Sequence, residues 1–509
     1  MDGPYLPVIS LDGKSLTLQA LWTIAEARAG VSIADNAGAT VTEARQRLEV
    51  VLQRLRPVYG ATTSVGAFKD MRVGSDDIMA FNRRLIHSHY LAMGDALDPT
   101  VVRAAMVIRL NTILTGHSGA SLRSARAIAD LINAGIVPVV RNFGSIGCAD
   151  VGQMSAIAAA LLGDGEVLYR DRVIPAGQAL VEAGLERLNP AQKDALVLIS
   201  TNALSVGAIA VALQTLRRQF WAQFAAFGIS AAAFGASRQP WRAAAEIAPD
   251  EARNMGRFLL NAFADDRWIE RNEVHDPLSY RFMPQIAGAA LHALAAAEAE
   301  LESMCNTSDD NPVVIGDEVY ASGGSLPLQL TLSIEKLMLA VAHLGRALFN
   351  RVVMLCRDDI TGLPRNLAPP HGAAIGFGAA TKLAADLFLT LMDEASPSSL
   401  HPTTVANGLE DEATNLPIIG RKLARQIDAL GKLIAFESVA GLQGVRLRGN
   451  RDQLLGLAGR IAERVDPAFP PLEDDRMLSY AFSAAEQAVC EPAWADALRE
   501  SYPYPVPAN

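Results

Sequence analysis

Several side chains in this sequence have the types and settings that proton transfer on a small carboxylic acid would need. Tyr59 lies in the stretch Val58-Tyr59-Gly60-Ala61-Thr62-Thr63-Ser64-Val65-Gly66, whose Gly and Thr content predicts a loop. A phenol takes a proton from carbon at neutral pH only when its pKa is depressed, so a general-base role for Tyr59 requires such a shift. Arg281 has a guanidinium fork that suits bidentate binding of a carboxylate. The structural alternatives are a turn-capping tyrosine and a surface ion pair.

Two further residues are unusual for their surroundings. Lys382 is the only cation in the apolar segment 373–392, which predicts a helix, and a buried lysine there would need an anion such as a carboxylate or a sulfur. The alternative is a side chain that reaches solvent at a subunit boundary. Cys148 lies in Gly144-Ser145-Ile146-Gly147-Cys148-Ala149-Asp150 without a neighbouring histidine base, which favours a packing role over a nucleophilic one.

Six stretches, in the right order and spread over roughly residues 11–463, resemble motifs of the histidine and aromatic amino-acid ammonia-lyase family. They are Tyr59-Gly60 with Gly66, Ser88-His89, Thr201-Asn202-Ala203-Leu204, His275-Asp276-Pro277-Leu278-Ser279-Tyr280-Arg281 with Pro284-Gln285, Asp310-Asn311-Pro312 with Ser322-Gly323-Gly324, and Glu410-Asp411. The resemblance implies an all-α fold, with a long central helical bundle of the fumarase and aspartase type and an active site built from loops. It also implies a homotetramer in which loops of several chains complete each site.

The segment that departs most from the family is Gly144–Asp150. In the family, an Ala-Ser-Gly tripeptide between a GS-G lead and an Asp cyclises to an electrophilic methylidene-imidazolone. The lead and Asp150 are present here, but Cys148-Ala149 stands where three residues are needed. The serine that dehydrates and the glycine whose amide attacks are both missing. We therefore expect a member of this family that works without that electrophile and without another cofactor.

A lyase without the electrophile needs a substrate with a better leaving group than an α-ammonium. A trimethylammonium group qualifies, because it departs as trimethylamine and has no N–H or lone pair with which to attack an electrophile. The family resemblance implies ergothioneine as the small-molecule substrate, converted to thiourocanate and trimethylamine. Three alternatives stay open: another betaine such as hercynine, an ammonia lyase with an unusual electrophile, and a scaffold that only binds.

The resemblance also implies roles for individual residues. Tyr59 would be the general base, and Tyr280 is a weaker second candidate because the family's matching tyrosine falls at Leu278. The remaining predicted contacts to substrate are Arg281 and Asn202 at the carboxylate, His89 and Glu410 at the imidazole-derived ring, His275 in place of a family Gln, Lys382 at the sulfur or the carboxylate, Asn311 near the carboxylate or structural, and Leu326 as an altered pocket wall where the histidine enzymes have Phe. No metal site is predicted.

Hydrophobic periodicity predicts the elements that must position these residues. Residues 1–190 are expected to form a helical and loop domain that carries Tyr59, His89 and the altered loop 144–155. Residues 191–509 are expected to form the long-helix bundle and the C-terminal helices. Helices are expected at 40–55, 76–94, 100–115, 121–134, 151–162, 194–216, 217–234, 249–263, 284–304, 333–355, 373–392 and 415–440, with short strands near 8, 167–175 and 313–319.

The bulk composition narrows the class of protein. A net charge of −10 with no basic block argues against nucleic acid as a partner. We also expect no membrane span, because no apolar run is predicted to reach about 18 residues free of charges, and the N-terminus lacks the pattern of a signal peptide. Four scattered cysteines without CxxC spacing fit a reducing compartment. The expectation is a cytoplasmic globular protein.

Overall fold

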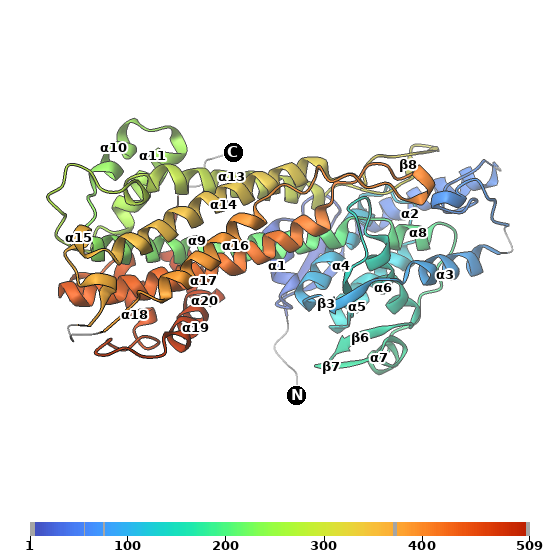
Figure 1. Cartoon of the computed structure of the whole chain (residues 1–509). Coiled ribbons are helices and arrows are strands. Elements are labelled where there is room, and N and C mark those ends of the chain that lie inside the picture. The colour runs from blue at the N-terminus through green and yellow to red at the C-terminus, as the bar shows by residue number, and fades with distance from the viewer. Residues whose placement is uncertain (1–5, 55, 75–76, 370–373, 505–509) are drawn as a thin grey trace. The chain divides into compact units, whose positions relative to one another are not determined.

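The computed structural model describes residues 6–54, 56–74, 77–369 and 374–504 (Figure 1). The chain forms two compact units, and each takes up several separate stretches of sequence. The first contains Met1–Val211, Ala297–Ser333 and Pro397–Arg421, and the second contains Ala212–Ala296, Ile334–Ser396 and Lys422–Asn509. The expected division at residue 190 would give two continuous segments. Each unit of the structure instead combines separate stretches of sequence.

The first unit is mainly helical, and its helices begin and end at residues that suit those positions. Ser121 precedes α5 (Leu122–Ala134) and accepts a hydrogen bond from the Ser124 N–H at 3.2 Å. The helix ends at Gly135, whose φ of +70° is the left-handed conformation that glycine adopts without strain. The other helices of this unit are α1 (Leu18–Ala25), α2 (Asp35–Gln53), α3 (Ile78–His89), α4 (Pro99–Leu114), α6 (Val151–Leu162), α7 (Ala176–Ala183), α8 (Asp194–Ile199) and the 3₁₀ turns η1 (Gly66–Phe68) and η4 (Ala406–Gly408).

Short strands between these helices pair with one another in small sheets. The pairs are parallel β1 (Val8–Leu11) with β2 (Gly30–Ile33), antiparallel β3 (Met93–Ala96) with β5 (Arg141–Phe143), antiparallel β6 (Glu166–Tyr169) with β4 (Val137–Pro138) on one side and β7 (Arg172–Pro175) on the other, and antiparallel β8 (Val313–Ile315) with β9 (Glu318–Tyr320). Strands were expected at the first, third and fourth of these places, whereas the β3–β5 pair was not.

The second unit is a bundle of long helices that buried polar contacts join. Arg351 of α14 (Leu328–Leu355) pairs with Glu437 of α17 (Leu416–Arg448) at 2.5 Å, and both side chains are fully buried. Gln426 of α17 donates to Met338 O of α14 at 2.9 Å, and Gln219 of α9 (Ala203–Phe234) donates to Ile427 O at 3.1 Å. These contacts confirm the expected all-α fold with a central helical bundle, whose long helices are labelled in Figure 1.

The remaining elements of the second unit surround this bundle. Helices α10 (Gln239–Ile247) and α11 (Asp250–Ala262) form a hairpin. The others are α12 (Leu278–Arg281), α13 (Met283–Cys305), which ends in the first unit, α15 (Asp358–Thr361), η3 (Arg365–Leu367), α16 (Ala380–Glu394), η5 (Arg451–Gln453), α18 (Leu457–Val465), α19 (Leu478–Val489) and α20 (Pro492–Ser501). The helices after residue 448 were not individually expected.

Several predicted helix limits were wrong. The expected pair 194–216 and 217–234 is instead the short α8, a break at Ser200–Asn202 and one continuous helix α9 of 32 residues. Helix α16 begins at Ala380 rather than at 373, a residue that lies outside the described part of the chain. Helix α14 begins five residues before the expected start, and α17 continues eight residues beyond the expected end.

The expectation that no uncharged apolar run is long enough to span a membrane was also wrong. Residues 195–216 carry no charged side chain, and the segment Asp194–Phe234 has a mean hydropathy of 2.1 in its most apolar window. That window is 83% buried inside the protein, as in the core helix of a globular domain. A second helix, Leu328–Leu355, passes the same length and composition test with 56% burial.

Candidate active site

The Tyr59 loop is fixed by its own backbone and by one close approach. The N–H groups of Ala61 and Thr62 donate to Val58 O at 3.1 and 2.9 Å. Gly60 has φ +67° and a side chain there would overlap Leu196, so both conformation and space require glycine. The Gly66 N–H donates to the Tyr59 phenol oxygen at 2.8 Å. The loop therefore holds the phenol in one place and stabilises its ionised form through a backbone donor.

Glu410 and Cys148 act electrostatically on Tyr59. Turn η4, just before Glu410, lies against turn η1 of the Tyr59 loop. Burial raises the pKa of Tyr59 above its usual value; the Gly66 N–H opposes this, and Glu410 and Cys148 raise it further. The depressed pKa expected for Tyr59 is thus not present in the chain by itself, because among the described residues the groups that shift it include no cation.

The altered loop is anchored so that Cys148 and Ala149 have fixed positions. Gly147 O accepts hydrogen bonds from the Thr414 hydroxyl at 2.9 Å and from the Thr414 N–H at 3.5 Å. A Cβ on Gly147, whose φ is +84°, would lie 2.7 Å from the Thr414 hydroxyl. Ala149 is left-handed, with φ +71°, and its N–H donates to Asn202 Oδ1 at 3.0 Å. The Cys148 thiol is half-buried, and burial, Glu410 and Asp150 raise its pKa to about 11. It is therefore a neutral thiol at neutral pH.

Asp150 joins the altered loop to the start of α9. Its carboxylate is fully buried and accepts from the Ser145 hydroxyl at 2.7 Å and from the Ser205 N–H and hydroxyl, both at 2.8 Å. Burial raises the pKa of Asp150, and these hydrogen bonds oppose the rise. An anion at the N-terminus of a helix is favoured by the helix dipole. The aspartate that follows the prosthetic group in the family motif is here a structural link between the altered loop and α9.

Asn202 ends the break before α9 but does not act as a side-chain cap. Its Oδ1 accepts from Ala149, its Nδ2 donates to Ser325 O at 2.8 Å, and its backbone N–H donates to Asp309 Oδ2 at 2.6 Å. The residue is fully buried. Asn202 therefore connects the altered loop to the turn before α14.

Asn311 and Leu326 belong to the turn that Asn202 contacts. Asn311 Oδ1 accepts from the Ser322 N–H at 2.9 Å, and the Asn311–Pro312 peptide is cis. Leu326 is 38% exposed, and its N–H donates to Gly323 O at 3.2 Å. Asn311 thus helps to shape this turn, and Leu326 is partly exposed.

His89 lies at the end of α3 beside the helix that follows the altered loop. Its Nδ1 is 2.8 Å from Leu85 O, which can only accept, so Nδ1 carries the proton and Nε2 is left as an acceptor. Ser155 of α6 donates to His89 O at 2.7 Å. The ring therefore has a fixed tautomer, and no described residue hydrogen-bonds to its Nε2.

The other predicted site residues belong to the second unit. Arg281, the last residue of α12, is half-buried, while His275 and Lys382 are exposed. The buried lysine considered for position 382 is therefore not found in the single chain. Tyr280 is 1% exposed, donates to or accepts from the Ser230 hydroxyl at 3.0 Å, and stacks on Phe234 with ring centroids 4.3 Å apart. Burial raises its pKa far above the ordinary value, which suits a core residue.

The first unit thus brings Tyr59, Cys148, Asn202 and Glu410 together. The residues that hold this cluster were not predicted to belong to the site. They are Ser145, Thr201, Ser205, Asp309 and Thr414. The acidic pair Asp309-Asp310 before Asn311-Pro312 was a visible signal, since two adjacent carboxylates require partners wherever they are buried. Within the described ranges, no group of three or more His, Cys, Asp or Glu side chains is placed to hold a metal ion.

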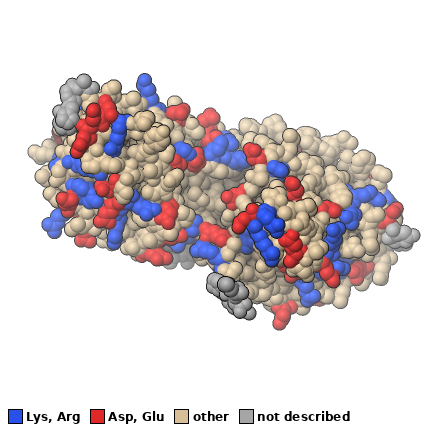
Figure 2. Space-filling model, turned by 90° about the horizontal axis from the view of Figure 1, so that it is seen from below, with Lys and Arg blue, Asp and Glu red and all other residues tan. Residues whose placement is uncertain are grey.

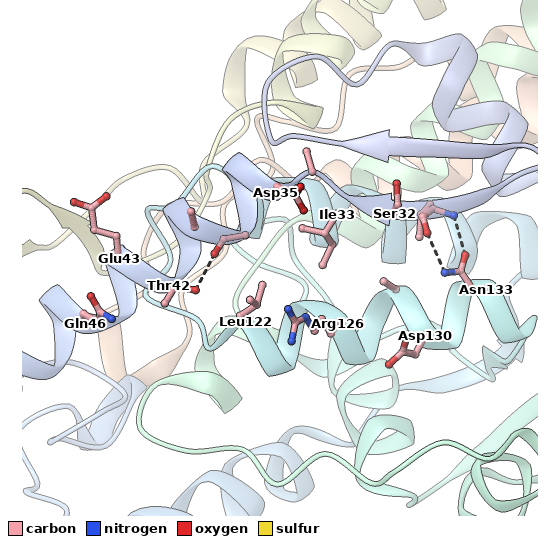
Figure 3. Close-up of a pocket in the computed structure, with 15 residues that line it drawn as sticks. Ser32, Ile33, Asp35, Thr42, Glu43, Gln46, Leu122, Arg126, Asp130 and Asn133 are labelled. Atoms are coloured by element: carbon pink, nitrogen blue, oxygen red, sulfur yellow. Dashed lines mark hydrogen bonds between the residues drawn. The ribbon is translucent and has the colours of Figure 1, made fainter.

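A separate groove of about 630 Å³ lies between α2 and α5 (Figure 3). Ile33 and Leu122 form part of its lining, and Asp35, Arg126 and Asp130 provide charges at its edges. The predicted site residues do not line it. On the molecular face in Figure 2, basic and acidic side chains are interspersed.

The helical bundle with a loop-built cluster around a tyrosine defines the class of protein as one with the ammonia-lyase and aminomutase fold. The chain belongs to the aromatic amino acid lyase family, whose sequence profile matches residues 16–466. It is 29% identical over 501 residues to a histidine ammonia-lyase of Geobacillus thermodenitrificans, covering 96% of this chain and 99% of the relative.

Solved structures give the same assignment. An ergothionase from Treponema denticola, in complex with desmethyl-ergothioneine sulfonic acid, superimposes with a TM-score of 0.91 at 26% identity and covers 96% of this chain and 99% of its own. Tyrosine aminomutase from Streptomyces globisporus has a TM-score of 0.90 at 24% identity, with 98% and 99% covered, and shares the fold.

The residues at the altered loop do not fit the family's prosthetic group. Cys148 and Ala149 supply neither the hydroxyl to be eliminated nor the glycine amide that closes the ring. The Ala149 N–H is also engaged by Asn202.

Proposed function

We propose that this protein is a carbon–nitrogen lyase that eliminates trimethylamine from ergothioneine to give thiourocanate, without a cofactor. The observation that carries the proposal is the altered loop: Cys148-Ala149 occupies the place of the electrophile-forming tripeptide and is anchored there by Asn202 and Asp150. The likeness to the ergothionase of Treponema denticola supports the same substrate class.

In the proposed reaction, substrate binding releases the Tyr59 phenol proton to solvent, and the phenolate oxygen then takes a proton from the β-carbon of the substrate. The electrons of that C–H bond form the double bond to the α-carbon. The α-carbon–nitrogen bond breaks, and its electron pair leaves with the nitrogen as neutral trimethylamine. Tyr59 is then a neutral phenol again, as in the empty site. No oxidant, reductant or second substrate is needed.

The electrostatics around Tyr59 favour a permanently cationic substrate. Burial and the Glu410 charge raise the pKa of Tyr59 while the site is empty, so the phenol is neutral in that state. A trimethylammonium group beside it would stabilise the phenolate and lower that pKa, which makes the substrate itself part of the activation. Glu410 would attract the same cation, because charges of opposite sign interact strongly in a partly buried site.

The other predicted residues complete the proposed site. Arg281 and Asn202 bind the substrate carboxylate, with Asn311 shaping the turn beside it. His89 and Glu410 contact the ring, and His275, Lys382 and Leu326 line the remaining pocket. Because Arg281, His275 and Lys382 belong to the second unit, we propose that they enter the site in a homotetramer, where chains share their loops. The protein would be cytoplasmic.

Parallel incubation of the purified protein with ergothioneine, hercynine and histidine tests the proposal. We expect a new conjugated chromophore and trimethylamine from ergothioneine alone. Turnover of hercynine as well would keep the betaine chemistry and remove the role of the sulfur. Ammonia from histidine, as the histidine ammonia-lyase relatives would suggest, would refute the proposal, and so would the absence of any reaction.

A further inference from the structure

A buried charge cluster lies directly behind the candidate site, and the proposed chemistry does not use it. Arg109 of α4 is 1% exposed and donates to Asp310 Oδ1 at 2.7 Å and to Asp309 Oδ1 at 3.4 Å. It also donates to Val197 O. Lys193 is equally buried and donates to Ser118 O at 2.9 Å. Two cations and two carboxylates therefore share one enclosed space.

The two carboxylates of this cluster have different partners. Asp309 Oδ2 accepts from the Thr201 hydroxyl at 2.8 Å and from the Asn202 N–H at 2.6 Å. Asp310 Oδ2 accepts from Ser308, its neighbour in sequence, at 2.9 Å. Only Asp309 therefore reaches the break between α8 and α9, although both carboxylates contact Arg109.

The contacts of Asp309 continue into the candidate site. Asn202, held by Asp309 at its backbone, accepts through its side chain from the Ala149 N–H and donates to Ser325 O. Ala149 is the residue after Cys148, in the loop whose charge neighbours include Tyr59 and Glu410. One carboxylate is thus connected, through a single asparagine, to both the altered loop and the turn before α14.

In the described part of the chain, the polar groups that contact Asp309 all donate to it. The Asn202 N–H and the Arg109 guanidinium can only donate, whereas the Thr201 hydroxyl could also accept. A proton on Asp309 would therefore either displace Asn202 or Arg109 or end the donation from the Thr201 hydroxyl. The charged groups that face Asp309 are Arg109, which favours its ionised form, and Asp310, which opposes it; Lys193 acts on Asp310.

We propose that Asp309 is a positioning residue for the reaction. In its ionised form it holds Thr201 and Asn202, and through Asn202 it holds the Cys148–Ala149 segment beside Tyr59. Protonation breaks one of these contacts and loosens that segment, so that turnover falls on the acidic side. Burial, with Arg109 opposing it, raises the pKa of Asp309 to about 6, which places this transition in an accessible range.

The kinetic part of this inference rests on the proposed function, but the loop movement can be measured without any substrate. Alkylation of Cys148 by iodoacetamide, followed by peptide mass spectrometry, reports how tightly the loop is held. Cys490 is the internal reference, because it is also half-buried and its pKa is also raised to about 11. The ratio of the two labelling rates therefore cancels the effect of pH on thiolate content.

Asp309→Asn and Asp310→Asn are the matched pair. Each removes one carboxylate charge next to Arg109, and only the first faces Asn202. We expect Asp309→Asn to raise the Cys148 to Cys490 labelling ratio about threefold or more at pH 8 and to lower kcat about tenfold with little change in KM. Asp310→Asn should leave the ratio unchanged. Equal ratios in the two variants, raised or not, would overturn the proposal.

Thr201→Val gives a second test if Asp309→Asn does not fold. It removes a hydroxyl that stabilises the ionised form of Asp309 and keeps nearly the same volume. We expect the pH below which the labelling ratio of the folded protein rises, about 6 in the parent, to move up by about half a unit or more, since one hydrogen bond contributes roughly 1 kcal/mol. An unmoved transition, or no transition in the parent protein, would overturn the proposal. These measurements stand even if ergothioneine is not the substrate.

Discussion

Two neighbouring regions of the first unit treat charge in opposite ways. In the buried cluster, Arg109 and Lys193 balance Asp309 and Asp310, and the described contacts satisfy both carboxylates. Around Tyr59, by contrast, Glu410 acts on a half-buried phenol and a half-buried thiol without a cation among the groups that shift the phenol pKa. The balanced region needs nothing more, whereas the unbalanced region would be completed by a positively charged ligand. This difference in charge balance supports the proposal of a trimethylammonium substrate.

Tyr59→Phe should give the largest effect, because it removes the proposed base and leaves the ring. We expect kcat for trimethylamine release to fall by about 10³-fold to 10⁴-fold, at the upper end of what one general base contributes. The unfolding midpoint in urea should stay nearly unchanged, since the phenol's hydrogen bond within the described residues is to a loop N–H. A variant that retains a tenth or more of parental kcat would remove Tyr59 from the chemistry.

Arg109→Met tests the balanced region. It leaves Asp309 and Asp310 side by side without their guanidinium, and breaking a buried pair in this way should cost about 3 kcal/mol of unfolding free energy. The exposed pair of Arg47 with Glu43, 2.6 Å apart, provides the control: Arg47→Ala should cost about 0.5 kcal/mol or less. Urea denaturation at pH 8 measures both. Similar losses would show that the burial of the cluster contributes little.

The loss in Arg109→Met should depend on pH in a defined direction. Without Arg109, the folded-state pKa of Asp309 rises further above its unfolded value, so protonation favours the folded state. Stability from such a group is present at low pH and is lost as pH rises through the folded pKa. The deficit of the variant against the parent should therefore be smaller at pH 5 than at pH 8. A larger deficit at pH 5 would contradict this account of the cluster.

Glu410→Gln tests the unbalanced region with a smaller effect. Because the Glu410 charge raises the pKa of Tyr59, its removal should shift the apparent pKa of the base downward in the profile of kcat/KM against pH. KM for the cationic substrate should rise about tenfold, because an attractive charge is lost. Asp411→Asn is the control, since this exposed neighbour removes an equal charge. An upward pKa shift, or equal effects of both variants, would contradict the proposed role.

The sequence allowed local elements to be predicted much better than their long-range supports. Helix α6 was predicted with the limits it has, because its Ala-rich pattern and Gly163 define both ends. The break at Ser200–Asn202 was not predicted, because Asp309, 108 residues away from Thr201, determines it. The same separation concealed Asp309 as part of the site. The apolar helix pattern left two interpretations of Lys382 open, a buried lysine beside an anion or a side chain that reaches solvent at a subunit boundary, and in one chain its side chain is exposed.

Tyr280→Phe has the smallest expected effect and compares the same residue type in a different setting. Tyr280 is enclosed in the second unit, where its hydroxyl meets Ser230 and its ring stacks on Phe234. Removing the hydroxyl leaves the Ser230 hydroxyl without this partner, which should cost about 1 kcal/mol of unfolding free energy. The rate should stay within about twofold of the parent, because burial holds the pKa of Tyr280 too high for a proton acceptor. If kcat instead fell as far as in Tyr59→Phe, Tyr280, the second candidate for the general base, would have to take part in the chemistry. Core packing alone would then not explain why a tyrosine occupies this position.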